Sequence, residues 1–356
     1  MHKNNFDFLR LCFALFVLIT HSYVLAGSDN DFLSRFTGGQ VNFSAIGLKG
    51  FFIISGFLIF ESLLRSRNWI DYMIKRVLRI YPALIVVLIF CFFLGLALSP
   101  EPAGQYLRDK DALSYVYGNL NLFAPLKYKI HNVFPQNPLP DAINGSLWTI
   151  PYEFLFYVLL SAFFIIRSHT KLITVLLVLL FGSLFLLKIK YSHQEGDLWM
   201  LPWPYEKKNL LNFALLFASG SLLASIRLHQ YKYKKAILVG SLMLCLVMIT
   251  IKQFEYTQYF LLPLLIITLG SLSTSYISGL NKSVGDFSYG IYLYGFPVQQ
   301  TLIHFFKLSP LGVLAVAMPI TILLAALSWF LIEKRALGIK QYLKEKRGVR
   351  IAEKLV

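Results

Sequence analysis

The stretch "FDFLRLCFALFVLITHSYVLAG" (residues 6–27) is almost wholly apolar, yet it contains Arg10 and His21. An apolar run of about 20 residues is long enough to cross a bilayer as a helix. On such a helix the two side chains share one face and lie about 16 Å apart along the axis. Because an ionisable group inside a membrane is costly, this shared face predicts a functional site or pathway. Two simpler interpretations stay open: Arg10 can reach back to the cytoplasmic surface, and His21 can be a neutral histidine hydrogen-bonded between helices.

The composition of the whole chain is typical of a membrane protein. Of its 356 residues, 56% are hydrophobic and 15% are charged, against about 25% charged residues in an average soluble protein. The net charge of +16 fits basic residues that collect in cytoplasmic loops better than a nucleic-acid-binding surface. The three cysteines lie in apolar runs and lack the spacing of a metal site or a disulfide.

Apolar runs bounded by charge, proline or glycine predict an all-α polytopic membrane protein with about ten transmembrane helices. The expected spans are 7–26, 44–64, 80–98, 147–166, 171–188, 209–226, 235–251, 256–273, 287–305 and 310–332. Most of the 34 Lys and Arg residues fall into segments that are cytoplasmic when both termini lie inside.

Residues 1–335 are expected to form one transmembrane domain, and 336–356 a basic cytoplasmic tail. The polar segment 99–146 is expected to form a long outer loop. The opening stretch is expected to remain as the first helix, and a cleaved signal peptide is the alternative for it.

A second polar constellation lies in "INGSLWTIPYEFLFYV" (residues 143–158). If this helix enters from the outer side near Leu147, Glu153 lies about 9 Å below its start, and His21 lies roughly 7.5 Å below the outer end of the first helix. The similar depth predicts that Glu153 orients His21 and stabilises its protonated form, as a general base requires. The alternative is a carboxylate that pairs with an unrelated cation.

The segment 65–79, expected as a short inner loop, carries five cations and leads into "RVLRIYPAL" (residues 76–84). Arg76 and Arg79 lie about one helical turn apart and can grip a phosphate bidentately. With Arg10 they predict a phosphate clamp on the cytoplasmic side, and ordinary positive-inside signalling is the alternative.

Hydroxyl and aromatic side chains supply the candidate substrate-binding residues. Ser55 lies in "FFIISGFLIF" (residues 51–60), and Tyr289 and Tyr292 lie in "DFSYGIYLYGFP" (residues 286–297). Trp148 is a further candidate, and plain packing is the alternative interpretation of the aromatic residues. Cations that grip phosphate on the inside and a base toward the outside predict a phosphorylated cytosolic donor and an extracytoplasmic acceptor.

Five motifs resemble, in this order, the acyltransferase-3 family of multi-helix membrane O-acyltransferases. They are "FDFLRLCFALFVLITH", "GFFIISGFLIF", "RVLRIYPAL", "NGSLWTIPYEFLFYV" and "SYGIYLYGFPVQQ". The segment "VFPQNPLPDAINGSLWT" (residues 133–149) is also similar to members that O-acetylate bacterial surface polysaccharides. The resemblance extends over nearly the whole chain.

The resemblance implies acetyl-CoA as the acyl donor and, as acceptor, a sugar hydroxyl of a polysaccharide or glycolipid such as O-antigen, across the bacterial inner membrane. It implies that His21 is the essential histidine and Arg10 its companion, that Arg76 and Arg79 lie on the donor side, and that Glu153 is the family's acid. Gly295 departs from the pattern, because many members carry a histidine there. A fused hydrolase-like domain, which many relatives carry, is not expected.

The sequence therefore predicts a membrane O-acetyltransferase that uses no metal. The expected catalytic residues are His21, Glu153 and Arg10; the expected donor-binding residues are Arg76, Arg79 and Arg10; the expected substrate-binding residues are Trp148, Ser55, Tyr289 and Tyr292. A transporter or flippase for a lipid-linked sugar is the rival, because transporters also place charged residues at mid-depth. Another acyl group, such as succinyl, or a small-molecule acceptor is a third possibility.

Overall fold

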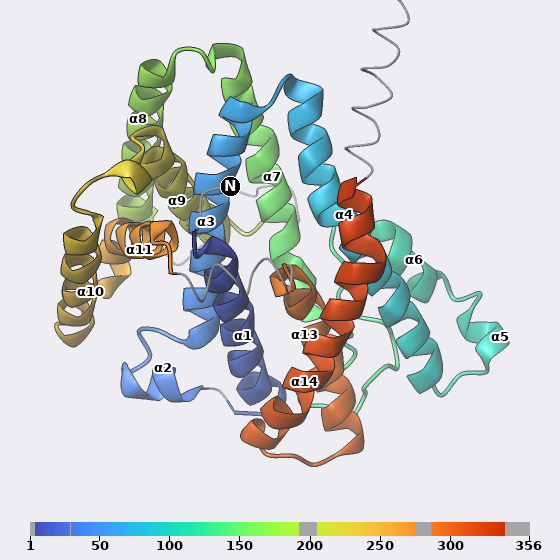
Figure 1. Cartoon of the computed structure of the whole chain (residues 1–356). Helices are drawn as coiled ribbons and strands as arrows, with labels where there is room; N and C mark the ends of the chain where they lie inside the picture. Colours follow the sequence, from blue (N-terminus) through green and yellow to red (C-terminus); the bar gives the residue numbers. More distant parts are fainter. Residues whose placement is uncertain (1–3, 29, 192–204, 275–285, 339–356) are drawn as a thin grey trace, which may run out of the picture.

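The computed structural model describes residues 4–28, 30–191, 205–274 and 286–338, and its regular elements in these ranges are helices (Figure 1). One isolated antiparallel bridge joins Lys129 to Ala142. The expected all-α fold class is confirmed for these ranges. The long helices are α1 (Phe6–Leu25), α3 (Phe43–Arg65), α4 (Trp69–Leu98), α7 (Ile150–Leu160), α8 (Thr170–Tyr191), α9 (Lys207–Ser225), α10 (Lys234–Thr250), α11 (Phe254–Ser271), α13 (Ser288–Phe305) and α14 (Pro310–Ser328). The short ones are α2 (Phe32–Phe36), α5 (Ala103–Tyr106), α6 (Lys110–Gly118), the 3₁₀ turns η1 (Gly145–Thr149), η2 (Ser161–Ile166) and η3 (Leu228–Gln230), and the π turn η4 (Trp329–Glu333).

Six helical stretches of the described chain are long and apolar enough to cross a membrane. They are Phe6–Leu25, Phe43–Arg65, Trp69–Leu98, Gly145–Ile166, Thr170–Tyr191 and Pro310–Gly338. The remaining expected spans are helical at the expected places, as α9, α10, α11 and α13. The total of ten spans and the inside location of both termini stay predictions.

Helix α4 begins well before the expected start at residue 80. The Asn68 side chain accepts a hydrogen bond from the Asp71 backbone amide and so caps the new start at Trp69. Most of the expected inner loop 65–79 is therefore helix, and that loop assignment is wrong. Its first turns are too polar to register as an apolar run, yet they place Arg76 and Arg79 on a rigid element.

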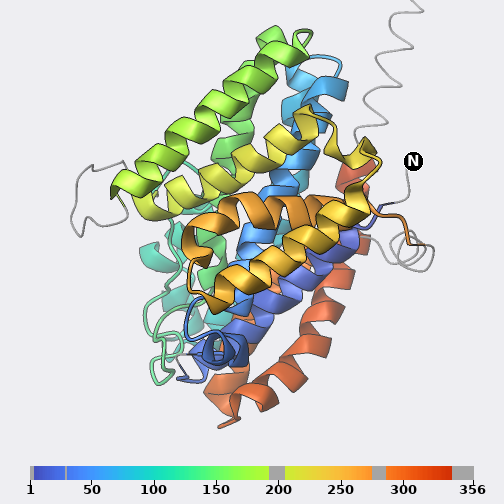
Figure 2. The ribbon, with the colours of Figure 1, turned by 90° about the vertical axis from the view of Figure 1, so that its left-hand side faces the viewer.

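Helices α1 and α3 lie in the middle of the bundle, with α8 to α11 on one side and α4, α13 and α14 on the other (Figures 1 and 2). Helices α3 and α9 approach closely through two glycines. A Cβ on Gly56 would lie 2.0 Å from the Phe217 carbonyl oxygen, and one on Gly220 would lie 2.1 Å from the Ile53 carbonyl oxygen. Small residues at such crossings let helix backbones pack directly in membranes.

The segment after α6, which was expected on the outer side, is fastened to α13 by amide side chains. Gln300 donates to the carbonyl oxygens of Leu139 and Ala142 at 2.8 and 2.9 Å, and Asn137 donates to the Gln300 side chain at 2.8 Å. These bonds satisfy buried backbone groups where the chain is not helical. The segment expected as a long outer loop is thus a fixed cap that includes α5 and α6.

Large apolar side chains remain exposed on α8, α10 and α14. Examples are Leu179 at 61%, Met243 at 63% and Leu323 at 60% exposure. An apolar surface of this extent is expected where helices face lipid. Helical structure runs on to residue 338, and the expected tail at 336–356 lies almost wholly outside the described residues.

Candidate active site

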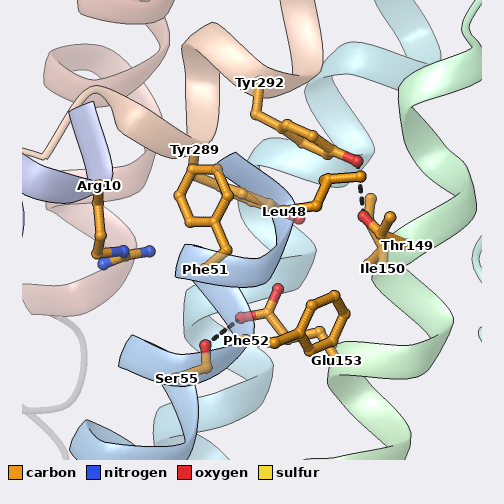
Figure 3. A pocket seen from close by; sticks show the side chains of 10 residues that line it. All are labelled: Arg10, Leu48, Phe51, Phe52, Ser55, Thr149, Ile150, Glu153, Tyr289 and Tyr292. Carbon is orange, nitrogen blue, oxygen red and sulfur yellow. Dashed lines mark hydrogen bonds between the residues drawn. The ribbon is translucent and has the colours of Figure 1, made fainter. Parts of the chain in front are cut away.

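A narrow cavity lies between α1, α3, η1, α7 and α13 (Figure 3). The centre of a water molecule can occupy about 30 Å³ of this cavity. One ordered water needs less space than that. Its lining is Arg10, Leu48, Phe51, Phe52, Ser55, Thr149, Ile150, Glu153, Tyr289 and Tyr292. Five of the residues singled out in the sequence therefore converge on one space.

Arg10 and Arg79 meet on one carboxylate oxygen. Asp286 Oδ2 lies 2.8 Å from Arg10 Nη1 and 2.7 Å from Arg79 Nη2. Burial alone would raise the pKa of Asp286, but the two guanidinium groups and hydrogen bonds from Ser288 hold that pKa well below its usual range. A cationic pair from α1 and α4 is thus joined by an acid placed just before α13.

Arg76 lies beside this pair but does not line the cavity. Its Nη2 donates to Ser62 Oγ at 3.1 Å, and its guanidinium carbon lies 5.6 Å from the ring centres of Tyr72 and Tyr157. Arg76 Nε and Arg79 Nη2 are buried without a hydrogen-bond partner among the described residues. The short contact from Arg79 to Asp286 is an ion pair without hydrogen-bond alignment. Arg76 Nε and Arg79 Nη2 can therefore each still donate a hydrogen bond.

Glu153 is held by hydroxyl groups. Ser55 Oγ donates to Glu153 Oε1 at 2.9 Å, and Tyr157 donates to the same oxygen in a short contact (Figure 3 shows the Ser55 bond). The predicted pairing of Glu153 with His21 is wrong, because the described carboxylate takes these partners from α3 and α7 instead. Equal depth in two helices does not place their side chains together.

His21 lies outside the cavity lining, beyond its Tyr292 end. The imidazole is half-buried and packs edge-on against the Phe296 ring, with the ring centres 5.5 Å apart. Phe296 follows Tyr292 by one turn of α13, about 6 Å along the axis. Within the described chain no hydrogen bond to the imidazole is formed, so its second nitrogen is not fixed by a carboxylate.

The tyrosines of α13 connect the arginines with η1. Tyr289 donates to the Ile80 carbonyl oxygen at 3.3 Å, and the Arg79 guanidinium lies 5.6 Å from the Tyr289 ring centre. The Tyr292 and Thr149 hydroxyls are 2.6 Å apart. Both tyrosines are therefore cavity walls as well as polar contacts.

Trp148 lies away from this space. Its ring packs on Tyr152 and Phe213, with centres 5.9 and 5.6 Å apart. Gly295, at the position where a histidine was noted in related motifs, faces α1, and a Cβ there would lie 2.7 Å from Leu18 Cδ1. The Leu18 side chain thus fills the space that a larger residue at position 295 would need.

Three acids near the arginines were not among the site residues predicted from the sequence. Asp7 and Asp286 interact electrostatically with Arg10 and Arg79. Glu333 lies on the π turn η4, which follows α14. It accepts a hydrogen bond from Ser328 at 3.0 Å and interacts electrostatically with Arg79. Asp286 is the first residue of the motif "DFSYG", and this motif was the one sequence signal for it. Glu333 had no such signal, because a π turn often occurs at a functional site but leaves no clear trace in a sequence. In the described ranges no group of three or more His, Cys, Asp or Glu side chains is arranged to hold a metal.

The chain is similar over nearly its whole length to two known proteins. The chain is 32% identical over 344 residues to an O-acetyl transferase of Shigella phage Sf6, with 95% of this chain and 97% of that protein covered. It is 28% identical over 374 residues to nodulation protein 10 of Rhizobium leguminosarum bv. viciae, with 97% and 96% covered. No solved structure matches the chain significantly. Residues 3–331, nearly the whole chain and the cavity with it, match the family described as the acyltransferase domain, and the chain therefore belongs to that acyltransferase family.

Proposed function

We propose that this protein is a membrane O-acetyltransferase. It moves an acetyl group from cytosolic acetyl-CoA to a hydroxyl of an extracytoplasmic polysaccharide or glycolipid, such as O-antigen, in a bacterial inner membrane. The full-length similarity to an O-acetyl transferase supports the reaction class. The apolar faces of α8, α10 and α14 support a site enclosed by lipid.

The observation that carries the proposal is the convergence of Arg10, Arg76 and Arg79 beside one end of the cavity. Within the described residues Arg76 Nε lacks a hydrogen-bond partner, and Arg79 Nη2 meets Asp286 as an ion pair without hydrogen-bond alignment. Buried donors are rarely left unpaired without a functional reason. Guanidinium groups bind phosphate with several directed hydrogen bonds. We assign these arginines to the phosphates of CoA, with the acyl arm directed along the cavity.

His21 is the proposed general base. An unprotonated ring nitrogen accepts the proton of the acceptor hydroxyl while that oxygen attacks the thioester carbonyl carbon. The new C–O bond forms, the C–S bond breaks, and the leaving CoA thiolate takes the proton from the imidazolium. Glu153 has a different role. Its carboxylate, held by Ser55 and Tyr157, lines the cavity between the arginines and Tyr292.

The acceptor is proposed to approach from the side of His21 and of the segment 119–144, which is the expected outer side. Tyr292 and Tyr289 are proposed to contact the acyl arm, since both line the cavity. Ser55 is proposed to act indirectly, by holding Glu153 through its hydrogen bond. Trp148 is a weaker contact candidate, because it packs on Tyr152 and Phe213 outside the lining.

The test is replacement of His21 by alanine in cells whose surface glycan is analysed by NMR and mass spectrometry. Wild-type protein restores acetyl groups to the glycan of a deletion strain, and His21→Ala does not, at equal amounts in the membrane. His304→Ala is the matched control, because His304 lies on the same bundle with its ring against Phe134. Full acetylation by His21→Ala would remove this residue from the mechanism, and a deletion that changes glycan export without changing acetylation would favour transport instead.

A further inference from the structure

Asp286 occupies the place where an external anion would bind. One of its oxygens faces both Arg10 and Arg79 at 2.7–2.8 Å, and the three side chains are only 15–18% exposed. A single oxygen shared by two guanidinium groups is the arrangement that a phosphate oxygen would also make. The carboxylate supplies charge here but leaves Arg79 Nη2 without an aligned hydrogen bond.

The charges of Arg10 and Arg79 are already partly compensated, because both arginines form an ion pair with Asp286. Arg10, Arg76 and Arg79 interact with the carboxylates of Asp7, Glu153, Asp286 and Glu333. A multiply charged phosphate that entered this group would meet like charges in a poorly hydrated place, which costs several kcal/mol. Donor binding therefore requires that a carboxylate give up its position.

Of these four carboxylates, Asp286 is the one that lies outside a helical turn. Asp7, Glu153 and Glu333 lie within helical turns of α1, α7 and η4, whereas Asp286 precedes the first turn of α13. Its carboxylate accepts hydrogen bonds from the Ser288 hydroxyl and amide. Movement of this one residue would therefore not break a helix.

We infer that Asp286 is an internal competitor of the donor, whose phosphate replaces the Asp286 carboxylate on Arg10 and Arg79. This inference rests on the proposed function. The exchange also frees the start of α13, the helix that carries the cavity residues Tyr289 and Tyr292. Donor binding is thereby coupled to the width of the cavity.

The experiment is calorimetric titration of CoA into the full chain in lipid nanodiscs. Asp286→Asn is expected to bind CoA about tenfold more tightly than wild type, because the competing charge is gone. Asp286→Glu keeps the charge and is expected to retain wild-type affinity. Glu61→Gln is the matched control: Glu61 pairs with Arg65 at 3.3 Å, outside the arginine group, and its loss is expected to change CoA affinity less than about twofold. Equal or weaker CoA binding by folded Asp286→Asn overturns the inference and assigns Asp286 to positioning the arginines.

A second measurement needs no variant. In hydrogen–deuterium exchange of wild-type protein, CoA is expected to increase exchange at the start of α13, because the Ser288 amide loses its carboxylate partner. Increased protection there would contradict the exchange of ligands on the arginines. Wild-type protein that neither binds CoA nor transfers its acetyl group would sink the proposed function itself, whereas tight wild-type binding with no gain in Asp286→Asn sinks only this inference.

Discussion

Hydroxyl groups make most of the side-chain hydrogen bonds around the cavity. Ser55 and Tyr157 both donate to Glu153, and Thr149 pairs with Tyr292. In a poorly hydrated interior such bonds are strong, and a polar group left without its partner is costly. The carboxylate of Glu153 is therefore fixed in place by neutral donors, and its charge remains available to the cavity.

Tyr157→Phe tests this arrangement at the residue scale. Loss of the phenol leaves the half-buried Glu153 carboxylate one donor short, which costs about 1 kcal/mol. We expect a lower midpoint of thermal unfolding in detergent and acetylation of the surface glycan reduced about tenfold. Tyr117→Phe is the control, because Tyr117 is 65% exposed on α6, and it is expected to behave like wild type. A Tyr157→Phe protein with unchanged stability and activity would show that Ser55 alone holds Glu153.

The pair of helices α3 and α9 sets the position of Ser55 and of the aromatic lining. Phe52 of α3 stacks on Phe213 of α9, with ring centres 4.1 Å apart. The Ser221 hydroxyl donates to the Gly56 carbonyl oxygen at 3.0 Å across the same crossing. The cavity wall formed by α3 is thus supported from behind by a direct backbone contact.

Gly220→Ala tests the crossing at the element scale. The added methyl group would lie 2.1 Å from the Ile53 carbonyl oxygen, and because the obstacle is backbone, the helices must separate at a cost of about 1–3 kcal/mol. We expect a lower thermal midpoint and weaker CoA binding. Gly182→Ala on α8 has nothing within 4 Å of the new Cβ and is expected to be neutral or stabilising by about 0.5–1 kcal/mol. Equal midpoints for the two variants would mean that the crossing adjusts freely.

For the molecule as a whole, hydropathy predicted the helical class and most helix positions, because the apolar runs and the long helices of the described residues coincide. Arg10, Ser55, Glu153, Tyr289 and Tyr292, singled out from separate motifs, line one cavity, and their roles stay predictions. Two features were beyond reach. The start of α4 depends on the Asn68 cap, which a hydropathy window does not detect. The ion pairs of Asp286 join residues more than 200 positions apart in the sequence. The depth of a residue along its helix gives its height in a membrane but not which other side chain it touches. For this reason the predicted pairing of Glu153 with His21 is wrong.

The predicted direction of the chain is testable at the same scale. With the native cysteines replaced, a cysteine at Arg67, between α3 and α4, is expected to react with a membrane-impermeant maleimide only from the cytoplasmic side. A cysteine at Tyr117, on α6, is expected to react only from the outside. Both side chains are exposed, so labelling reports topology rather than burial. The opposite pattern would reverse the proposed donor and acceptor sides.

The narrowness of the cavity has a consequence for the cell's energy supply. A bacterial inner membrane stores work as a difference in proton concentration and voltage, and an open tube through it would dissipate that store. Among the described residues the cavity has only about 30 Å³ of free space, and its lining includes Phe51 and Phe52. If the protein lies in such a membrane, as proposed, a space of this size holds few water molecules at a time, and the leak of protons through it is expected to be small.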